Sequence, residues 1–223
     1  MNLQESTFSS SRSATFTSKV LSLFGLALLV SGIGVYAGIH YGAQYFYTAP
    51  ATMLICFAVE LGLIFTSRLW SKIEPLNYFL FTAFTFISGV TIVPLILSFA
   101  AEFKGFGLIY SALFATTATF GAAGLFGYTT KRSLAGLSGF LFMSLIGLLV
   151  VGIGGIFFPW GNNMEMLVSG FGVLIFAGYA AVDINRLKEY PEDEYIQAAM
   201  HLYLDFFNLF IYILRLTGAV SRN

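Results

Sequence analysis

The sequence predicts an all-α, polytopic membrane protein with seven transmembrane helices. Three observations support this prediction. The 223 residues are 57% hydrophobic and only 10% charged, whereas soluble domains carry about 25% charged residues. The chain contains seven apolar runs of about 20 residues, which is the length that crosses the hydrocarbon layer of a bilayer. The connections between these runs are short, as in an up-and-down helical bundle.

The expected spans lie at 20–40, 51–69, 77–100, 106–128, 134–158, 166–187 and 195–217. The Ser- and Thr-rich residues 1–18 are expected to form a disordered cytoplasmic tail, and residues 19–218 the seven-helix domain. The first run is too long for the core of a signal peptide, so we expect it to be retained as a membrane anchor. Frequent glycines along the runs allow close contact between helices.

Charge and cysteine content exclude several classes of function. The formal net charge is zero, so nothing indicates nucleic acid as a partner. The single cysteine, Cys56, lies inside an apolar run, which leaves no disulfide and no cysteine-based metal site. We expect no cofactor and no enzymatic activity.

The distribution of Lys and Arg predicts the orientation in the membrane. Three of the eleven basic residues, Lys104, Arg215 and Arg222, fall on the far side of the expected spans. The other eight share the side of the N-terminus; they are Arg12, Lys19, Arg68, Lys72, Lys131, Arg132, Arg186 and Lys188. This asymmetry places the N-terminus in the cytoplasm. A six-span arrangement with a re-entrant last segment fits the charges as well, and it would leave both termini inside.

The last run, HLYLDFFNLFIYILRL, carries a carboxylic acid near its middle. Placing an ionised carboxylate at the centre of a bilayer raises the free energy of membrane insertion by roughly 3 kcal/mol. Five polar residues recur in this run at intervals of four, three, four and three, so they share one face of a helix. They are His201, Asp205, Asn208, Tyr212 and Arg215. Because a polar face is not turned toward lipid, we expect this helix to lie inside the bundle.

A second acid, Asp183, lies about one turn before the cytoplasmic end of the sixth span. Asp205 lies deeper, so the two carboxyl groups meet only if the last helix begins in the cytoplasm. Two carboxyl groups in one low-dielectric site are not both charged at low cost, so such a pair would share a proton and titrate as a unit. The pair is a candidate pH-sensitive latch and transient Ca²⁺ site. In the alternative, Asp183 pairs with Arg186 and Asp205 joins a structural polar network.

Four further ionisable residues in or near the spans have two interpretations each. Glu60 is either a third acid on an ion pathway or a carboxyl group hydrogen-bonded to a neighbouring helix. Arg68 and Lys72 either extend to the cytoplasmic interface or counter the charge of the aspartates. His201 either tunes the pH response or is a packed neutral histidine.

A GLSG sequence at 136–139 matches the GxSG of rhomboid proteases, and His201 follows it in the order that a Ser–His dyad needs. Ser138, however, lies at the cytoplasmic start of a span, and no glycine-rich packing motif surrounds His201. This match is therefore weak evidence for a protease.

The stretch LYLDFFNLFIYILRL resembles the C-terminal signature of the Bax inhibitor-1 (transmembrane Bax inhibitor motif) family. Three further stretches are similar to the bacterial branch of that family: FTFISGVTIVPL, GYTTKRSLAGLSGFLF and GYAAVDINRLK. The resemblance extends over residues 50–218.

The resemblance implies a bundle with the C-terminal helix at its centre and a pH-sensitive calcium leak gated by one aspartate on each of the last two helices. Asp183 and Asp205 match those aspartates, and Glu60 matches an acid on the second helix. The basic residue that family members carry on the second helix is replaced by Ser71, with basic residues three positions before it and one after it. Ser133 stands where an aspartate is common.

We therefore predict a protein of the inner (plasma) membrane that passively conducts calcium, with lipid and calcium ions as its partners. Asp183 and Asp205 would hold the sixth span against the last, while Asn208 and Tyr212 would line the path. Family members that lack the aspartates are associated with regulating a membrane-bound ATP-dependent protease. The alternative is therefore a non-conducting adaptor that modulates such a protease or a stress response. Because this chain has both aspartates, we favour the leak.

Overall fold

The structure is a computed structural model. It describes residues 3–43, 49–158 and 160–222, and the side chains of these ranges except those of 3–13, 50 and 156. The described part is helical with no strands, which confirms the all-α class. Six helices are long and apolar enough to cross a membrane. One more apolar helix, Ala51–Phe65, is shorter, so the count of seven crossings stays a prediction.

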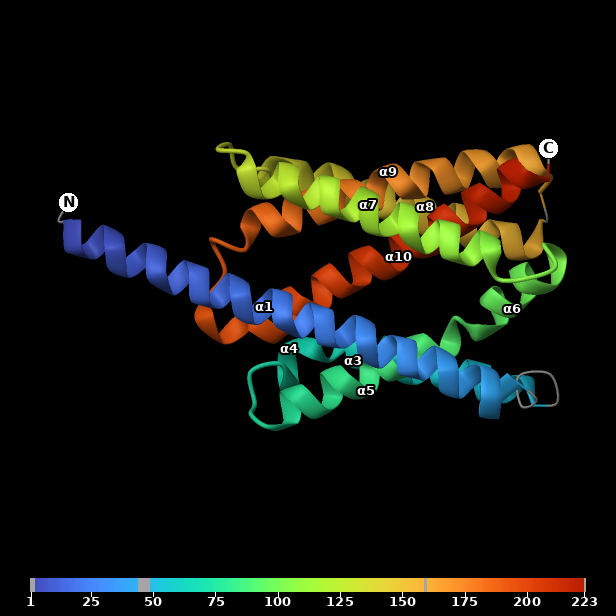
Figure 1. The fold of residues 1–223 in the computed structure, drawn as a ribbon, viewed down its shortest axis with the longest axis horizontal. Coiled ribbons are helices and arrows are strands. Elements are labelled where there is room, and N and C mark those ends of the chain that lie inside the picture. The colour runs from blue at the N-terminus through green and yellow to red at the C-terminus, as the bar shows by residue number, and fades with distance from the viewer. Residues whose placement is uncertain (1–2, 44–48, 159, 223) are drawn as a thin grey trace. The chain divides into compact units, whose positions relative to one another are not determined.

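Within residues 3–43 and 49–102 the structure describes five α-helices (Figure 1). Helix α1 (Leu3–Ala37) continues as a π-helical turn at Gly38–Gly42. The short helix α3 (Pro50–Phe65), whose first residue is a proline that suits the first turn of a helix, is followed by α4 (Ser67–Trp70). Helices α5 (Leu76–Thr91) and α6 (Val93–Glu102) complete this half.

Helix α1 begins at Leu3, within the stretch 1–18 that the sequence analysis expected to form a disordered tail, and the disorder of this tail stays a prediction. Residues 3–18 contain neither glycine nor proline. No helix-breaking residue therefore separates this polar stretch from the apolar run, and the helix extends through both. Residues 1 and 2 of the predicted tail lie outside the described residues.

The span predicted at 77–100 is interrupted at Ile92, between α5 and α6. Pro94 is the cause that the sequence offers, since a proline lacks the backbone N–H and its ring collides with the carbonyl group four residues earlier. Backbone hydrogen bonds are present before and after this interruption. The Ile92 amide donates to the Ser88 carbonyl oxygen at 3.3 Å, and the Ile96 amide donates to the Ile92 carbonyl oxygen at 3.1 Å. Taken together, the two helices (Leu76–Glu102) are long and apolar enough to cross a membrane.

In the described residues after Glu102 there are four longer helices, which match the last four predicted spans within a few residues. Helix α7 is Gly107–Thr129 and helix α8 is Ser138–Phe157, preceded by a 3₁₀ turn at Ala135–Leu137. Helix α9 is Asn162–Arg186. Helix α10 is Tyr195–Ser221, preceded by a 3₁₀ turn at Glu192–Glu194.

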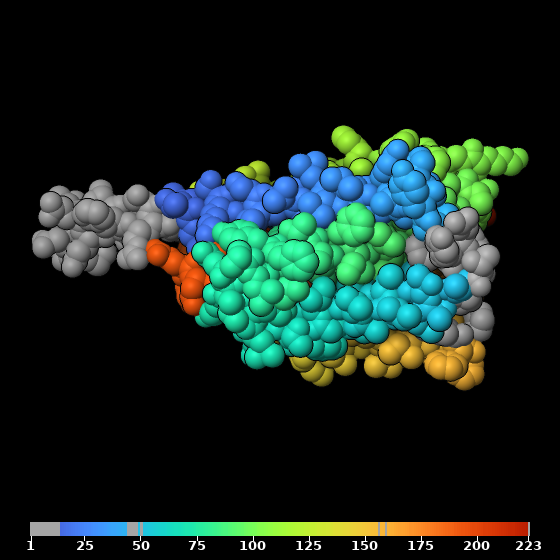
Figure 2. Space-filling view, turned by 90° about the horizontal axis from the view of Figure 1, so that it is seen from below, coloured from blue at the N-terminus to red at the C-terminus, as the bar shows by residue number. Residues whose placement is uncertain are grey.

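The chain divides into two compact units, and α10 contributes to both. The first unit comprises Met1–Ser98 and Leu187–Tyr203. Within it α1 packs along α5 at two glycines: a Cβ atom on Gly89 would lie 2.0 Å from the Ser31 carbonyl oxygen, and one on Gly34 would lie 2.2 Å from the Phe86 carbonyl oxygen. At these glycines the backbones of α1 and α5 approach each other as closely as glycine allows. Helix α3 also lies beside α5, on one face of this unit (Figure 2).

The second unit comprises Phe99–Arg186 and Leu204–Asn223. Here α7 packs along α9, and a Cβ atom on Gly127 would lie 2.1 Å from the Ala181 carbonyl oxygen. Helix α8 packs on α9, where Leu141 fills the space beside Gly178. Glycine contacts therefore set the helix spacing in both units.

The outer faces of the helices are strongly apolar. Large side chains of α8 such as Phe140, Met143 and Phe157 are 67–72% exposed. On α3, Leu54 and Phe65 are 72% and 82% exposed. Such surfaces would be unfavourable in water and are suited to lipid. They support a multi-pass membrane protein.

We expect Gly127→Ala to destabilise the second unit, because its Cβ atom would overlap the backbone of α9. Overpacking of this kind typically costs about 1–3 kcal/mol, measurable as a lower unfolding temperature in detergent micelles. Gly121→Ala on the same helix is the matched control, because nothing lies within 4 Å of its Cβ position. Equal stability of the two variants would contradict the close contact between α7 and α9.

Candidate functional site

Asp183 and Asp205 lie together in the second unit. Asp183 is in the last turn of α9, and Asp205 is about three turns into α10. Both side chains are buried, with 9% and 5% exposure. The Asp183 carboxyl group is within hydrogen-bonding reach of the Asp205 carboxyl group. The helices that carry them therefore bring two acids into one nearly dry site.

One oxygen of this pair has no partner. The Oδ2 atom of Asp205 is buried and has no hydrogen-bond partner within the described part of the chain. A buried, unsatisfied carboxyl oxygen is costly. It is the type of atom that a proton, a water molecule or a cation would satisfy.

Two residues that the sequence analysis missed support the pair. Tyr179 lies one turn before Asp183 on the same helix face, and its phenol group is close enough to both aspartates to interact with them electrostatically. Asn185 ties the end of α9 to the segment between α7 and α8: its Nδ2 atom donates to the Gly127 carbonyl oxygen at 2.9 Å, and its Oδ1 atom accepts from the Leu134 amide at 2.9 Å. The spacing of four between Tyr179 and Asp183 is the signal that could have identified the tyrosine.

The polar face of α10 beyond Asp205 is engaged in local contacts. The Asn208 amide donates to the Leu204 carbonyl oxygen of its own helix at 2.8 Å. The Tyr212 ring fills the space above Gly172 and stacks on Phe176, with 5.6 Å between ring centroids. The role of Asn208 and Tyr212 along an ion path stays a prediction.

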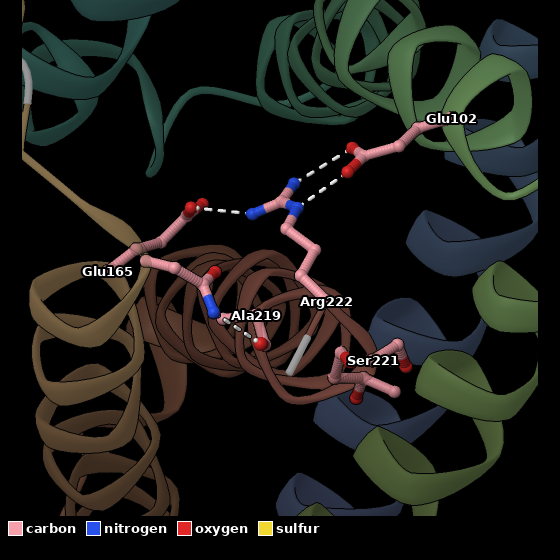
Figure 3. Close-up of polar contacts among 7 residues, drawn as sticks. Glu102, Glu165, Ala219, Ser221 and Arg222 are labelled. Carbon is pink, nitrogen blue, oxygen red and sulfur yellow. Dashed lines mark hydrogen bonds and ion pairs between the residues drawn. The ribbon is translucent and has the colours of Figure 1, made fainter.

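The end of α10 is held by an ionic clamp that the sequence analysis also missed (Figure 3). The Arg222 guanidinium donates to both oxygens of Glu102, from Nε at 2.6 Å and from Nη2 at 2.8 Å. Its Nη1 atom donates to Glu165 Oε2 at 2.7 Å, and Asn162 Nδ2 donates to the Ala219 carbonyl oxygen at 2.8 Å. These contacts join the end of α10 to the end of α6 and the start of α9.

Lys72 pairs with acids of the connection between α9 and α10. Its Nζ atom lies 2.8 Å from Asp193 Oδ2 and 2.9 Å from Glu194 Oε1. Two hydrogen bonds raise the pKa of Lys72: the larger contribution comes from Asp193 and the smaller one from Glu194. Lys72 is thus part of an ion pair at the surface of the first unit, and a role as countercharge for the aspartates stays a prediction. Arg68 is exposed and makes no ion pair with any residue whose side chain the structure describes, as expected for a residue that extends to the interface.

The same connection is fastened to the first unit by Tyr195. Its hydroxyl group donates to Glu74 and accepts from Asn77 Nδ2 at 3.0 Å, and Lys19 Nζ lies 3.2 Å from the centre of its ring. Ser71 is fully buried in this unit, and its Oγ atom has no hydrogen-bond partner among the described residues.

Glu60 and His201 are both hydrogen-bonded within the first unit. Glu60 is buried and accepts hydrogen bonds from Ser88 and Thr91 of α5, the latter at 3.1 Å. The carboxyl group is thus hydrogen-bonded to a neighbouring helix, and its role on an ion pathway stays a prediction. The His201 Nδ1 atom lies 3.1 Å from the Tyr190 hydroxyl group, so the ring is engaged with the connection between α9 and α10.

The chain is similar to known proteins over nearly all of its length. A family model described as "Inhibitor of apoptosis-promoting Bax1" matches residues 13–222. An uncharacterised protein of Campylobacter jejuni is 33% identical over 208 residues, which cover 93% of this chain and 89% of that protein. Bax inhibitor 1 of Schizosaccharomyces pombe is 33% identical over 78% of this chain and 64% of its own length. Protein lifeguard 4 of Mus musculus is 30% identical over 93% of this chain and 86% of its own length.

We expect Arg222→Gln to lower the unfolding temperature in detergent, because it removes the charged partner of both Glu102 and Glu165. The three side chains are 28–41% exposed, so the loss should be at most about 1 kcal/mol. This loss of stability should be smaller at about 1 M salt than at about 0.1 M, because the added salt shortens the Debye screening length from about 10 Å to about 3 Å.

Arg215→Gln is the control for this change, because Arg215 is exposed and makes no ion pair with any residue in the described ranges. A loss for Arg222→Gln that is equal at both salt concentrations would show that the side chain stabilises the end of α10 by packing on Phe99 rather than by charge.

Proposed function

The chain belongs to the Bax inhibitor family, and on this premise we propose that it is a pH-sensitive passive calcium leak of the inner membrane. In this proposal the pair formed by Asp183 and Asp205 is the gate. The protein is a multi-pass membrane protein with the N-terminus on the cytoplasmic side, and calcium is the permeant ion.

The observation that carries the proposal is the buried carboxyl pair itself. The two acids come from the last two helices, lie within hydrogen-bonding reach and include one oxygen without a partner. In a low-dielectric site two carboxylates repel each other strongly, so one shared proton is the favourable state. The shared proton holds α9 against α10 in the second unit.

Loss of that proton changes the contact in two ways. The two carboxylates repel, and together they offer the oxygen ligands that Ca²⁺ prefers. Asp183 and Asp205 are therefore both the pH sensor and the transient calcium ligands of the proposal. Each pH unit across a proton-linked step is worth about 1.4 kcal/mol, or a factor of ten in an equilibrium. A closed–open equilibrium of a few kcal/mol is within reach of such a change.

The surrounding contacts suit a gate at this position. Asn185 anchors α9 two residues beyond Asp183, and the Arg222 clamp anchors α10 at its far end. In the second unit α9 is thus held just beyond Asp183, and α10 is held at its end, about five turns beyond Asp205. A change in the charge of the pair is therefore expected to act on the segments between these anchors.

We expect calcium entry into dye-loaded proteoliposomes to depend on pH in the wild type and to lose that dependence in Asp183→Asn and Asp205→Asn. An asparagine hydrogen-bonds but does not titrate at these pH values. The measurement compares flux at about pH 6 and about pH 8, an interval over which one proton-linked equilibrium changes up to about a hundredfold.

Glu189→Gln is the matched control, because this acid is exposed in the connection between α9 and α10. It should keep the wild-type pH profile. Flux with an unchanged pH profile in both aspartate variants would make the pair structural. An absence of flux from folded wild-type protein would overturn the leak and favour a non-conducting adaptor of a protease or a stress response.

A further inference from the structure

A groove lies between α8 and α9 within the second unit. Every residue that lines it is apolar or glycine except Ser144. The hydroxyl group of Ser144 donates to the Phe140 carbonyl oxygen of its own helix at 2.9 Å, so this polar group is already satisfied. The volume of the groove is about 420 Å³, within the range of about 300–1,000 Å³ that is typical of ligand pockets. The groove is therefore large enough for a ligand and is suited to an apolar one.

The floor of the groove is buried, and its walls are open to the surroundings. Leu148 and Ile175, which form the floor, are 7% and 9% exposed. Phe140, Phe171 and Leu174 of the same lining are 62–71% exposed. In a membrane protein an exposed apolar surface of this kind faces the acyl chains of the lipids. A ligand therefore reaches the groove from the bilayer rather than from water.

The groove is about as long as one leaflet of a bilayer is deep. Its α8 lining extends over residues 140–151, which is about 16 Å along a helix, and one leaflet contributes about 15 Å to a hydrocarbon core of about 30 Å. The two helices come together at one end, where a Cβ atom on Gly178 would lie 2.9 Å from Leu141. Beyond the other end, the Trp160 ring covers Gly155. The length of the groove therefore suits one extended acyl chain.

Basic residues precede the end of the groove at which α8 begins. The connection between α7 and α8 carries Lys131 and Arg132, which are exposed and make no ion pair with any residue whose side chain the structure describes. The Asn185 Nδ2 atom lies 3.4 Å from the Arg132 carbonyl oxygen, so this connection is held at the end of α9. The sequence contains no Asp or Glu over residues 103–164. The connection therefore carries positive charge with no acid of its own to compensate it.

We infer that the groove holds an acyl chain of an anionic phospholipid, with the phosphate group of the lipid beside Lys131 and Arg132. The hydrocarbon chain matches the apolar lining, and the negative head group matches the basic connection. Helix α8 begins at the same end, and the positive N-terminal end of its dipole also favours an anion. Basic residues at the ends of membrane helices attract anionic lipids in the same way. This inference goes beyond the proposed calcium leak and does not depend on it.

The test measures lipid binding to the full chain in an uncharged detergent by native mass spectrometry. The probes are phosphatidylglycerol and phosphatidylcholine with identical acyl chains, so that only the charge of the head group differs. Each basic residue near an anionic lipid strengthens the attraction about fivefold. We therefore expect one phosphatidylglycerol molecule to bind about 25-fold more tightly than phosphatidylcholine. Replacing Lys131 and Arg132 together by glutamine should abolish this preference.

Lys104→Gln is the matched control for the head group, because Lys104 is an exposed basic residue of the same unit that lies outside the connection between α7 and α8. It should keep the wild-type preference for phosphatidylglycerol.

Gly147→Leu tests the groove itself. Gly147 lines the groove and has nothing within 4 Å of its Cβ position, so a leucine side chain would occupy the space of the acyl chain. We expect this variant to bind both lipids more weakly than the wild type. Gly152→Leu is the matched control, because Gly152 lies on the same helix in equally open surroundings and is not part of the lining. It should bind both lipids as the wild type does.

Three results would overturn the inference. Equal affinity of the wild type for the two lipids would indicate ordinary boundary lipid. Displacement of phosphatidylglycerol by inorganic phosphate would indicate a site for a soluble anion, to which the groove contributes nothing. A dimer that is lost in Gly147→Leu, with the lipid preference unchanged, would assign the groove to a second copy of the chain. The glutamine replacements of Lys131 and Arg132 lie in an exposed connection, so they keep the test decisive even if Gly147→Leu lowers the stability of the fold.

Discussion

Hydrocarbon offers no hydrogen-bond partner, and this constraint explains most polar contacts in the structure. Glu60 is satisfied by two hydroxyl groups of a neighbouring helix. Asn185 is satisfied by backbone atoms, and many serine and threonine side chains bond to the carbonyl group one turn back, as Thr116 does. Against this background the Oδ2 atom of Asp205 and the Oγ atom of Ser71, which have no partner among the described residues, are exceptions, and the carboxyl oxygen is the more costly of the two when it is charged.

The helices could be predicted from the sequence because an apolar run of membrane-spanning length must satisfy its backbone hydrogen bonds internally, as an α-helix does. Interruptions inside a run are harder to predict. Pro94 is visible in the sequence, yet the hydropathy of 77–100 is continuous across it, and only the backbone geometry separates α5 from α6. The start of α1 at Leu3 was also not visible in the polar composition of this stretch. Residues 3–18 contain neither glycine nor proline, so the helix of the apolar run can continue into them without a new nucleation step.

The candidate site could be predicted in part, since an acid within a span draws attention wherever it lies. The helical spacing identified the polar face of α10, and the resemblance to a family paired Asp205 with Asp183. The partners of charged residues near the ends of helices could not be predicted, because Arg222 and Lys72 contact acids that are far away in the sequence. Nothing local distinguishes an arginine that clamps two helices from one that extends into solvent. Tyr203 escaped notice because a tyrosine within an aromatic-rich run looks like ordinary core.

Helix α10 carries residues that take part in two separate sets of polar contacts. Tyr203 belongs to a hydrogen-bonded cluster with α1 and α5, and Asp205 belongs to a carboxyl pair with α9. Because successive residues are rotated by about 100° around a helix, a spacing of two directs these side chains to nearly opposite sides. A continuous helix transmits rotation and translation between neighbouring turns with little loss, since its backbone hydrogen bonds resist local bending. In the proposed function, the charge of the pair formed by Asp183 and Asp205 acts on α10 within the second unit, while the earlier turns of this helix belong to the first unit.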